Sequence, residues 1–218
     1  MKQLICTGDS LADIWPSHAK QMIDHDEFFV YQIGGGSLDL QIKSLLNHFI
    51  KYPIVKNYII VSQFTGMGRI SMPIDNDLAE VSDNDNMYIF ENHLSNTTEY
   101  LANNSKKHTY VNMDEKHIYN SGHTRVRDLV AVHCLLSRLG ADVRVFRGWL
   151  GVMPAELWKQ CCEMYDRDGV SYTDKTLVET AVNISVDEKD WIDEFHPDDD
   201  LSRDSLKIVL DSIVLKGK

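Results

Sequence analysis

Lys2-Gln-Leu-Ile-Cys-Thr-Gly-Asp-Ser-Leu-Ala-Asp-Ile-Trp15 is the stretch of sequence that decides the fold. Its pattern predicts a short apolar strand over residues 4–6, a break at Thr7-Gly8, and a polar Asp9-Ser10 pair ahead of a helix. A serine in that place stands at the carboxyl end of a strand, where open α/β sheets bind their ligands. The turn would also aim backbone N–H groups at the attacked atom and favour developing negative charge. Taken by themselves, residues 8–11 are more typical of a turn with a helix N-cap than of a nucleophile.

The composition is that of a soluble globular protein. The chain has 218 residues, of which 43% are hydrophobic and 25% charged, and we expect one domain over residues 1–218. Its 22 basic and 33 acidic residues give a net charge of −11. Because nucleic acids and anionic membranes require a positive field, neither is expected as a partner. The oligomeric state stays open.

The cysteines and the first residues of the chain indicate in which cellular compartment the protein is expected. Cys6, Cys134, Cys161 and Cys162 show no metal-ligand spacing, and reduced thiols in a cytosolic protein are the simplest interpretation. The first residues run directly into the predicted strand, which is not typical of a signal peptide, and no apolar run is long enough to span a membrane. These features predict a cytoplasmic protein.

Strands and helices are expected to alternate along most of the chain. Further strands are predicted over residues 28–33, 58–61 and 142–146. Helices are predicted over residues 12–23, 38–49, 124–139, 155–165 and 201–214, with Leu38, Ile42, Leu45, Leu46 and Phe49 as the apolar face of the second. Asp199, Asp200 or Ser202 is the expected cap of the last helix. This alternation predicts an α/β fold with a parallel sheet and helices on both faces.

Two segments interrupt this regularity. Residues 67–122 are rich in Asn, Asp, Ser and His and are interpreted as an insertion after the third strand, an extended loop region with one or two short helices. Such a long loop is typical of a lid or binding element. Its histidines show no tight pairing, so no metal site is expected. Residues 166–190 are interpreted as irregular and acidic.

A second polar group stands just before the last predicted helix. In Asp193-Glu-Phe-His196-Pro197 an aspartate precedes a histidine by three residues. It can accept a hydrogen bond from one ring nitrogen and leave the other to act as a base. With Ser10, the chain order is nucleophile, orienting acid and base. Gly34-Gly35-Gly36 follows the second strand without the spacing of a phosphate-binding loop, so no cofactor is expected.

With these blocks the chain resembles the SGNH, or GDSL, hydrolases. Residues 8–11 match the first block of the family and residues 193–197 its last block, while Gly35 is the preferred match to the second-block glycine and Gly36 the reserve. The resemblance implies a three-layer α/β/α flavodoxin-like sandwich and ester hydrolysis by Ser10, His196 and Asp193. It also implies an oxyanion hole formed by the backbone N–H groups of Ser10 and Gly35 and by an asparagine side chain.

That asparagine is missing from this chain. Ser62-Gln63-Phe64-Thr65-Gly66 stands where the family has its third block, Gly-x-Asn-Asp. The Gln63 amide and the Thr65 hydroxyl are the candidate replacements. Losing one oxyanion donor lowers turnover on the order of 10²–10³-fold. The sequence is therefore compatible with both an active hydrolase and one that has lost its activity. The Gln-x-Thr pattern is similar to phage and bacterial branches of the family, which suggests a phage-encoded protein acting in the host cell.

The leading hypothesis is therefore an SGNH-type serine esterase that cleaves a small-molecule or carbohydrate acyl ester, with an O-acetylated carbohydrate as one candidate substrate. The alternative hypothesis is a catalytically lapsed binding or interaction module, with the insertion as its contact surface. The missing asparagine favours the alternative, whereas the presence of Ser10, Asp193 and His196 favours the enzyme.

Overall fold

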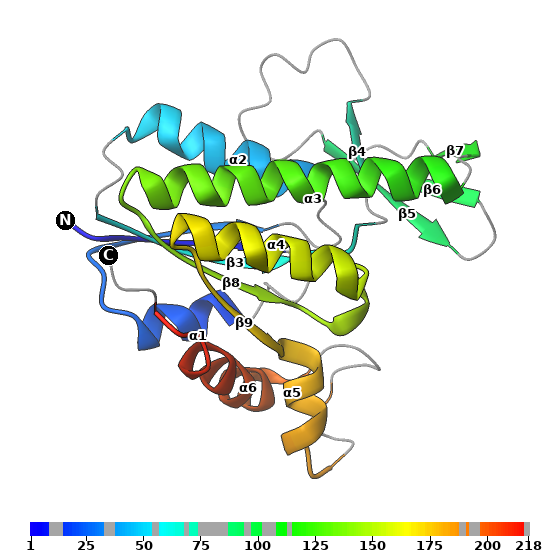
Figure 1. Ribbon diagram of the computed structural model, residues 1–218. Helices are drawn as coiled ribbons and strands as arrows, with labels where there is room; N and C mark the ends of the chain where they lie inside the picture. Colours follow the sequence, from blue (N-terminus) through cyan, green and yellow to red (C-terminus); the bar gives the residue numbers. More distant parts are fainter. Residues whose placement is uncertain are drawn as a thin grey trace.

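A five-stranded parallel sheet forms the centre of the protein (Figure 1). The computed structural model describes residues 1–8, 15–32, 38–53, 57–67, 70–73, 87–93, 97–101, 108–112, 115–187, 191 and 197–215. The strand order is β2-β1-β3-β8-β9, and all four neighbouring pairs are parallel. The strands are β1 (Gln3–Gly8), β2 (Glu27–Gln32), β3 (Tyr58–Phe64), β8 (Asp142–Arg147) and β9 (Ser171–Thr176).

Helices cover both faces of this sheet (Figure 1). One face carries α2 (Leu38–Lys51), α3 (Glu115–Arg138) and α4 (Ala155–Asp168). The other carries α1 (Trp15–Met22), α5 (Leu177–Ile184) and α6 (Asp199–Asp211). A short 3₁₀ turn, η4 (Leu150–Val152), follows β8. The predicted α/β fold with a central parallel sheet is confirmed.

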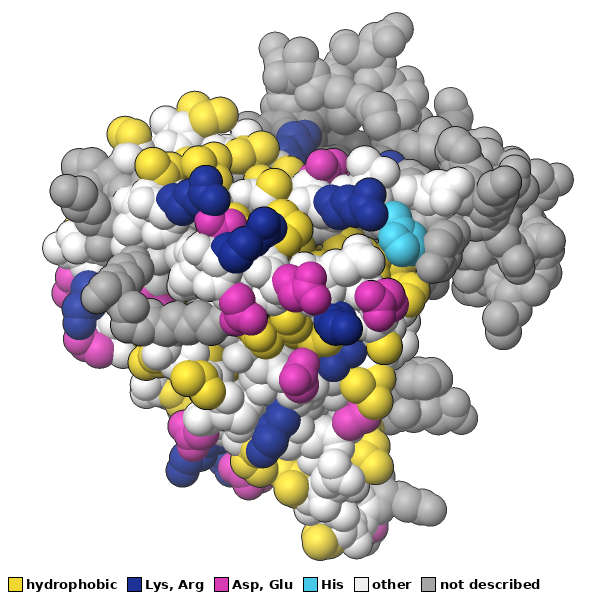
Figure 2. All heavy atoms as spheres, in the orientation of Figure 1, with side chains coloured by type: hydrophobic (Ala, Val, Ile, Leu, Met, Phe, Trp, Pro, Cys, Tyr) yellow, Lys and Arg dark blue, Asp and Glu magenta, His cyan; other side chains and the backbone are white. Residues whose placement is uncertain are grey.

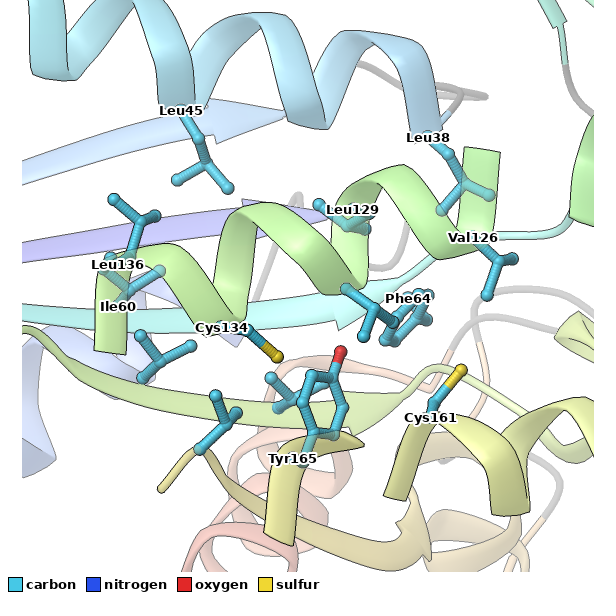
Figure 3. Packing of buried hydrophobic residues seen from close by; sticks show 14 of the residues in the cluster. Leu38, Leu45, Ile60, Phe64, Val126, Leu129, Cys134, Leu136, Cys161 and Tyr165 are labelled. Atoms are coloured by element: carbon cyan, nitrogen blue, oxygen red, sulfur yellow. The ribbon is translucent and has the colours of Figure 1, made fainter. Parts of the chain in front are cut away.

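The central strands are buried on both sides, which is why they read as nearly continuous apolar runs. Along β1, Ile5 belongs to the core under α2–α4, while Leu4 and Cys6 belong to the core under α1, α5 and α6. Figure 3 shows side chains of the first core: Leu38, Leu45, Leu129, Ile60 and Phe64. Each fully buried side chain of this size contributes about 1.5–3 kcal/mol by its removal from water.

The buried face of α2 (Leu38–Lys51) includes two polar residues that were not predicted on it. Leu38, Gln41, Leu45 and His48 are buried, whereas Leu46, which was expected on the apolar face, is 42% exposed. The buried spacing of three and four residues is helical, but two of its positions are polar. His48 Nδ1 lies 2.8 Å from the Tyr31 hydroxyl of β2, and Gln41 Nε2 donates to the Gln63 backbone oxygen of β3, while Gln41 Oε1 has no partner among the described residues. The predicted face is therefore correct at Leu38 and Leu45, with Ile42 and Phe49 partly buried against the same core, and wrong at Leu46.

Helix α3 starts at Glu115, ahead of the predicted start at residue 124. Gly122 lies inside this helix, although glycine in a helix interior costs about 1 kcal/mol relative to alanine. In the structure a Cβ on Gly122 would lie 2.7 Å from the backbone oxygen of Met67 and 2.8 Å from its Cβ. The glycine is therefore a site of close approach between the helix and the chain that leaves β3, rather than a helix end.

Replacing Gly122 with alanine should lower the free energy of unfolding by about 1–3 kcal/mol, because the new methyl group overlaps a backbone atom. Helix propensity acts in the opposite direction by about 1 kcal/mol. Asn120→Ala, at an exposed position of the same helix, is the matched control and should not destabilise the protein. Urea unfolding of both variants measures the difference. Equal stability of Gly122→Ala and the parent would contradict the close approach.

Part of the predicted insertion forms a second sheet. Its antiparallel strands are β4 (Ile70–Pro73), β5 (Met87–His93), β6 (Thr97–Leu101) and β7 (His108–Asn112), in that order. The expected loop region with short helices is wrong for these residues. The strands are short and mix apolar with polar residues, so their period-two pattern is weak. In Figure 1 this sheet stands beyond the first turns of α3.

The segment over residues 166–190, predicted to be irregular, contains β9 and α5. Helix α5 carries a capping box, since the Glu179 N–H donates to Thr176 Oγ1 at 3.3 Å and the Thr176 hydroxyl donates to the Glu179 carboxylate. The four-residue pattern Thr-Leu-Val-Glu was the available signal. The cap of α6 is Asp198, which accepts from the Leu201 N–H at 2.8 Å, and not one of the three residues predicted.

The surface shown in Figure 2 carries interspersed basic and acidic side chains over its described elements. All four cysteines lie in the described part of the chain and are free thiols, with Cys6, Cys134 and Cys161 buried. Burial raises the pKa of Cys134 and Cys161 to about 12. None of the helices in the described ranges combines the length and apolar character needed to cross a lipid bilayer.

Candidate active site

The predicted catalytic residues Ser10, Gly35, Asp193 and His196 lie outside the described residues. The elements that border them are described. Gly8 ends β1 and is paired in register with Gln32, which ends β2. Trp191 and Pro197 form an isolated antiparallel bridge just before α6. The site is therefore built from these bordering residues and from Gln63 and Thr65, the predicted positions that the structure describes.

Gln63 is a strand residue and not the loop residue expected of a third block. It lies in β3 with no exposed surface. Its Oε1 accepts a hydrogen bond from Trp15 Nε1 at 2.8 Å, and its backbone oxygen accepts one from Gln41 Nε2 at 2.7 Å. Because the indole can only donate, the Gln63 amide must present its oxygen to Trp15, which leaves the amide nitrogen as its donor. Contacts from α1, to the side chain, and from α2, to the backbone, thus meet at this residue of β3.

Thr65 follows directly after β3 and also has no exposed surface. Its Oγ1 has no hydrogen-bond partner within the part of the chain that the structure describes. A buried hydroxyl without a partner costs about 1–3 kcal/mol, so such groups in proteins usually have a function or a bound partner. Thr65 thus places an uncommitted donor at the carboxyl end of the central strand.

The Ser–His contact that the structure does describe is a different one. Ser62 Oγ lies 3.0 Å from His133 Nε2, and His133 Nδ1 lies 2.9 Å from the Tyr165 hydroxyl. Ser62, His133 and Tyr165 have no exposed surface, and burial lowers the pKa of His133 to about 3. Because each of these side chains is bonded to another within the core, the network is a satisfied polar group between β3, α3 and α4.

Solved structures share this architecture. The crystal structure of TesA matches with a TM-score of 0.53 and 12% sequence identity, over 97% of both chains. A member of the lipolytic protein G-D-S-L family from Veillonella parvula matches with a TM-score of 0.53 and 13% identity, again over 97% of both chains. Neither the protein-family models nor the curated protein sequences contain a match.

The chain has an SGNH/GDSL hydrolase-like fold. In this GDSL-like fold β3 is the last strand before the second sheet, with Gln63 inside the strand and Thr65 directly after its end. The residues that surround Gln63 were not among the predicted site residues. Trp15 stands shortly after the predicted nucleophile, and Gln41 interrupts an apolar helix face with a polar side chain. These two features of the sequence could have indicated Trp15 and Gln41 as neighbours of the site.

A charged residue, Arg147, stands at the carboxyl end of β8. It is buried, its guanidinium lies 4.8 Å from the Trp158 ring centroid, and its Nη2 donates to the Asp174 backbone oxygen at 3.1 Å. Burial lowers the pKa of Arg147, and the Asp174 charge opposes that shift. Because Trp158 Nε1 donates to Asp174 Oδ1 at 2.7 Å, the cation is part of a packed cluster between α4 and β9.

Proposed function

We propose that the protein is a serine hydrolase that cleaves acyl esters with Ser10 as nucleophile, His196 as base and Asp193 as the acid that orients it. One observation supports the proposal: in a GDSL-like fold, the elements that precede and follow the predicted triad residues along the chain contact one another. Residues 9–14 lie between the end of β1 and the start of α1, and residues 192–196 lie just before α6. Helix α1 contacts both β3 and α6, through Trp15 and His18. The three triad residues belong to segments that these contacts border.

The chemistry follows from the roles of the three residues. His196 accepts the proton of the Ser10 hydroxyl as the Oγ attacks the acyl carbonyl, and Asp193 stabilises the resulting imidazolium. The tetrahedral intermediate then expels the alcohol, which takes its proton from His196. Water then attacks the acyl-enzyme while His196 accepts its proton. The second tetrahedral intermediate collapses, releasing the carboxylic acid, and His196 returns the proton to Ser10. No cofactor enters these steps.

The oxyanion formed in each step needs preorganised donors, because charge stabilisation is usually the largest catalytic term. The backbone N–H groups of Ser10 and Gly35 are two of the proposed donors. The third is the Thr65 hydroxyl, which is supported by its burial without a partner among the described residues. Gln63 supports the same strand end from within β3, with its amide orientation set by Trp15.

The proposed substrate is a small-molecule or carbohydrate acyl ester, with an O-acetylated carbohydrate as one candidate. Strand β3 ends at Phe64 and β4 begins at Ile70, so the second sheet follows the site directly along the chain. We therefore assign the wall of the alcohol-binding side to this sheet. Neither a nucleic acid nor a membrane is proposed as a partner, given the net charge of −11.

Labelling with a fluorophosphonate probe tests the proposal, because the probe reacts with activated serines. The parent should be labelled on Ser10, and Ser10→Ala and His196→Ala should not be labelled. Ser17→Ala, which removes an exposed serine from α1, is the matched control and should be labelled like the parent. Mass spectrometry of the modified peptide identifies the site.

A well-folded parent that is not labelled would overturn the enzyme and favour the second candidate, a binding module that kept the fold. The specific observation behind this candidate is the absence of the third-block asparagine. Circular dichroism and thermal unfolding show whether the unlabelled protein is folded.

A further inference from the structure

Helix α1 is the described element that connects the two predicted catalytic segments. It is an eight-residue helix that begins at Trp15, directly after residues 9–14, and it packs against α6, which begins directly after residues 192–198. Its first turn buries two polar side chains, Trp15 and His18. Each of them contacts a different element, and neither contact was expected from the sequence.

Trp15 joins the start of α1 to the central sheet. Its ring is completely buried, lies edge-on to Phe146 of β8 with ring centroids 5.3 Å apart, and donates its N–H to Gln63 Oε1 at 2.8 Å. A buried aromatic ring with its polar atom bonded has little freedom to move. The chain that leaves the Ser10 segment is therefore held against the carboxyl end of β3.

His18 joins the same turn to the start of α6. It is buried, and its Nε2 lies 3.0 Å from Asp199 Oδ1, although the contact lacks the angle of a hydrogen bond. Asp199 is the first residue of α6 and follows His196 by three positions. The cap residue Asp198 fixes the helix start by accepting from the Leu201 N–H. The chain that leaves the His196 segment is therefore held against α1.

We propose that Trp15 and His18 are positioning residues, and that α1 aligns Ser10 with His196 by tying one segment to β3 and the other to α6. This inference rests on the proposed function. The physical reason is the steep dependence of proton transfer on geometry, in which a displacement of about 1 Å can cost on the order of 10²-fold in rate. Residues that lock the supporting contacts therefore control turnover without touching the substrate.

Asp199→Asn tests the His18 contact, with Asp200→Asn as its matched control. Both carboxylates lie in the first turn of α6 and are similarly exposed, at 75% and 78%, but Asp200 pairs with Arg203 and not with His18. With p-nitrophenyl acetate as substrate, Asp199→Asn and His18→Gln should each lower kcat about tenfold and leave KM nearly unchanged. Asp200→Asn should leave both constants unchanged. Asp199→Glu, which keeps the charge, should restore most of the lost rate.

The His18→Gln, Asp199→Asn double variant completes a cycle. Because both substitutions break the same contact, the one between His18 and Asp199, the double variant should be no slower than either single variant. Independent, multiplying losses would overturn the assignment of His18 as a positioning residue acting through Asp199. So would an equal loss in Asp200→Asn, since that loss would come from helix charge rather than from the contact.

Trp15→Phe tests the other contact, with Trp158→Phe as its matched control. Each replacement removes one indole N–H bond, to Gln63 at 2.8 Å or to Asp174 at 2.7 Å. We expect similar losses of stability in urea unfolding but a fall in kcat of about tenfold for Trp15→Phe only. Equal kcat values in the two variants would overturn the positioning role of Trp15.

Hydrogen exchange separates this inference from the proposed function. In His18→Gln the peptide that spans residues 191–201 should exchange faster than in the parent, and in Trp15→Phe the peptide that spans residues 8–15 should do so. If these changes occur in a protein whose Ser10 is not labelled, α1 positions the segments and the proposed hydrolase is wrong. If exchange of both peptides is unchanged, the positioning role is wrong whatever the activity.

Discussion

Thr65→Val should lower kcat by about 10²–10³ while leaving the protein at least as stable as the parent. The hydroxyl is the donor that we assign to the oxyanion, so its loss removes charge stabilisation in the transition state. The same hydroxyl is buried without a hydrogen-bond partner among the described residues. Replacing it with a methyl group of similar shape removes a desolvated polar atom, which should raise the free energy of unfolding by up to about 1 kcal/mol.

Thr7→Val is the matched control, because Thr7 in β1 is equally buried and its Oγ1 likewise lacks a partner in the described ranges. It should show the same gain in stability and no loss of turnover.

Gln63→Leu should have the opposite effect on stability. It leaves the buried Trp15 N–H without its acceptor and should destabilise the protein by about 1–3 kcal/mol. Steady-state kinetics with p-nitrophenyl acetate and urea unfolding measure both quantities. A Thr65→Val variant with parental kcat would transfer the third donor to Gln63 or remove it from the mechanism.

The protein should lose stability steeply between pH 6.5 and pH 5, because buried histidines must stay neutral in the folded state. Burial lowers the pKa of His133 to about 3. Burial, with a smaller effect of Lys51, lowers the pKa of His48 to about 4, and Glu27 opposes this shift. In the unfolded chain both imidazoles take up a proton near pH 6.5. The unfolded state therefore binds more protons as the pH falls, and the full stability is present only above pH 6.5.

One pKa unit corresponds to about 1.4 kcal/mol, so His133 should cost about 2 kcal/mol between pH 6.5 and pH 5. His48 is buried as well, and we expect about 1–2 kcal/mol from it over the same pH range. Urea unfolding at pH 7.5 and pH 5 measures the sum, and His48→Gln should reduce the pH dependence. An NMR titration of the folded protein checks His133 directly. An imidazole midpoint near pH 6.5 for His133 would contradict the prediction.

Elements with strong local patterns were predicted correctly from the sequence. Strands β1, β2, β3 and β8 are short apolar runs between breaking residues, and the structure confirms all four with ends shifted by a few residues. Strand β9 was missed because Ser171–Thr176 contains aspartate and lysine, as an edge strand tolerates. Helix α5 was missed although its capping box was present in the sequence.

The triad remains a prediction, because Ser10, Asp193 and His196 lie outside the described residues. What the structure adds concerns the third block. The sequence offered Gln63 and Thr65 as equal alternatives, and only the packing distinguishes them. Gln63 is in the strand with its amide oxygen bonded, whereas Thr65 is past the strand end with its hydroxyl unbonded within the described part of the chain.

By itself the sequence determined the α/β class, the parallel sheet and the resemblance to SGNH hydrolases, because hydrophobic periodicity and short polar blocks act over a few neighbouring residues. Only the tertiary structure decided which polar groups are partners. Trp15 and Gln63, or Ser62 and His133, are far apart in the chain and meet because the sheet and its helices bring them together. A hydrogen bond depends on distances and angles within a few tenths of an ångström. No local pattern carries that information, so the positioning role of α1 emerged only from the folded protein.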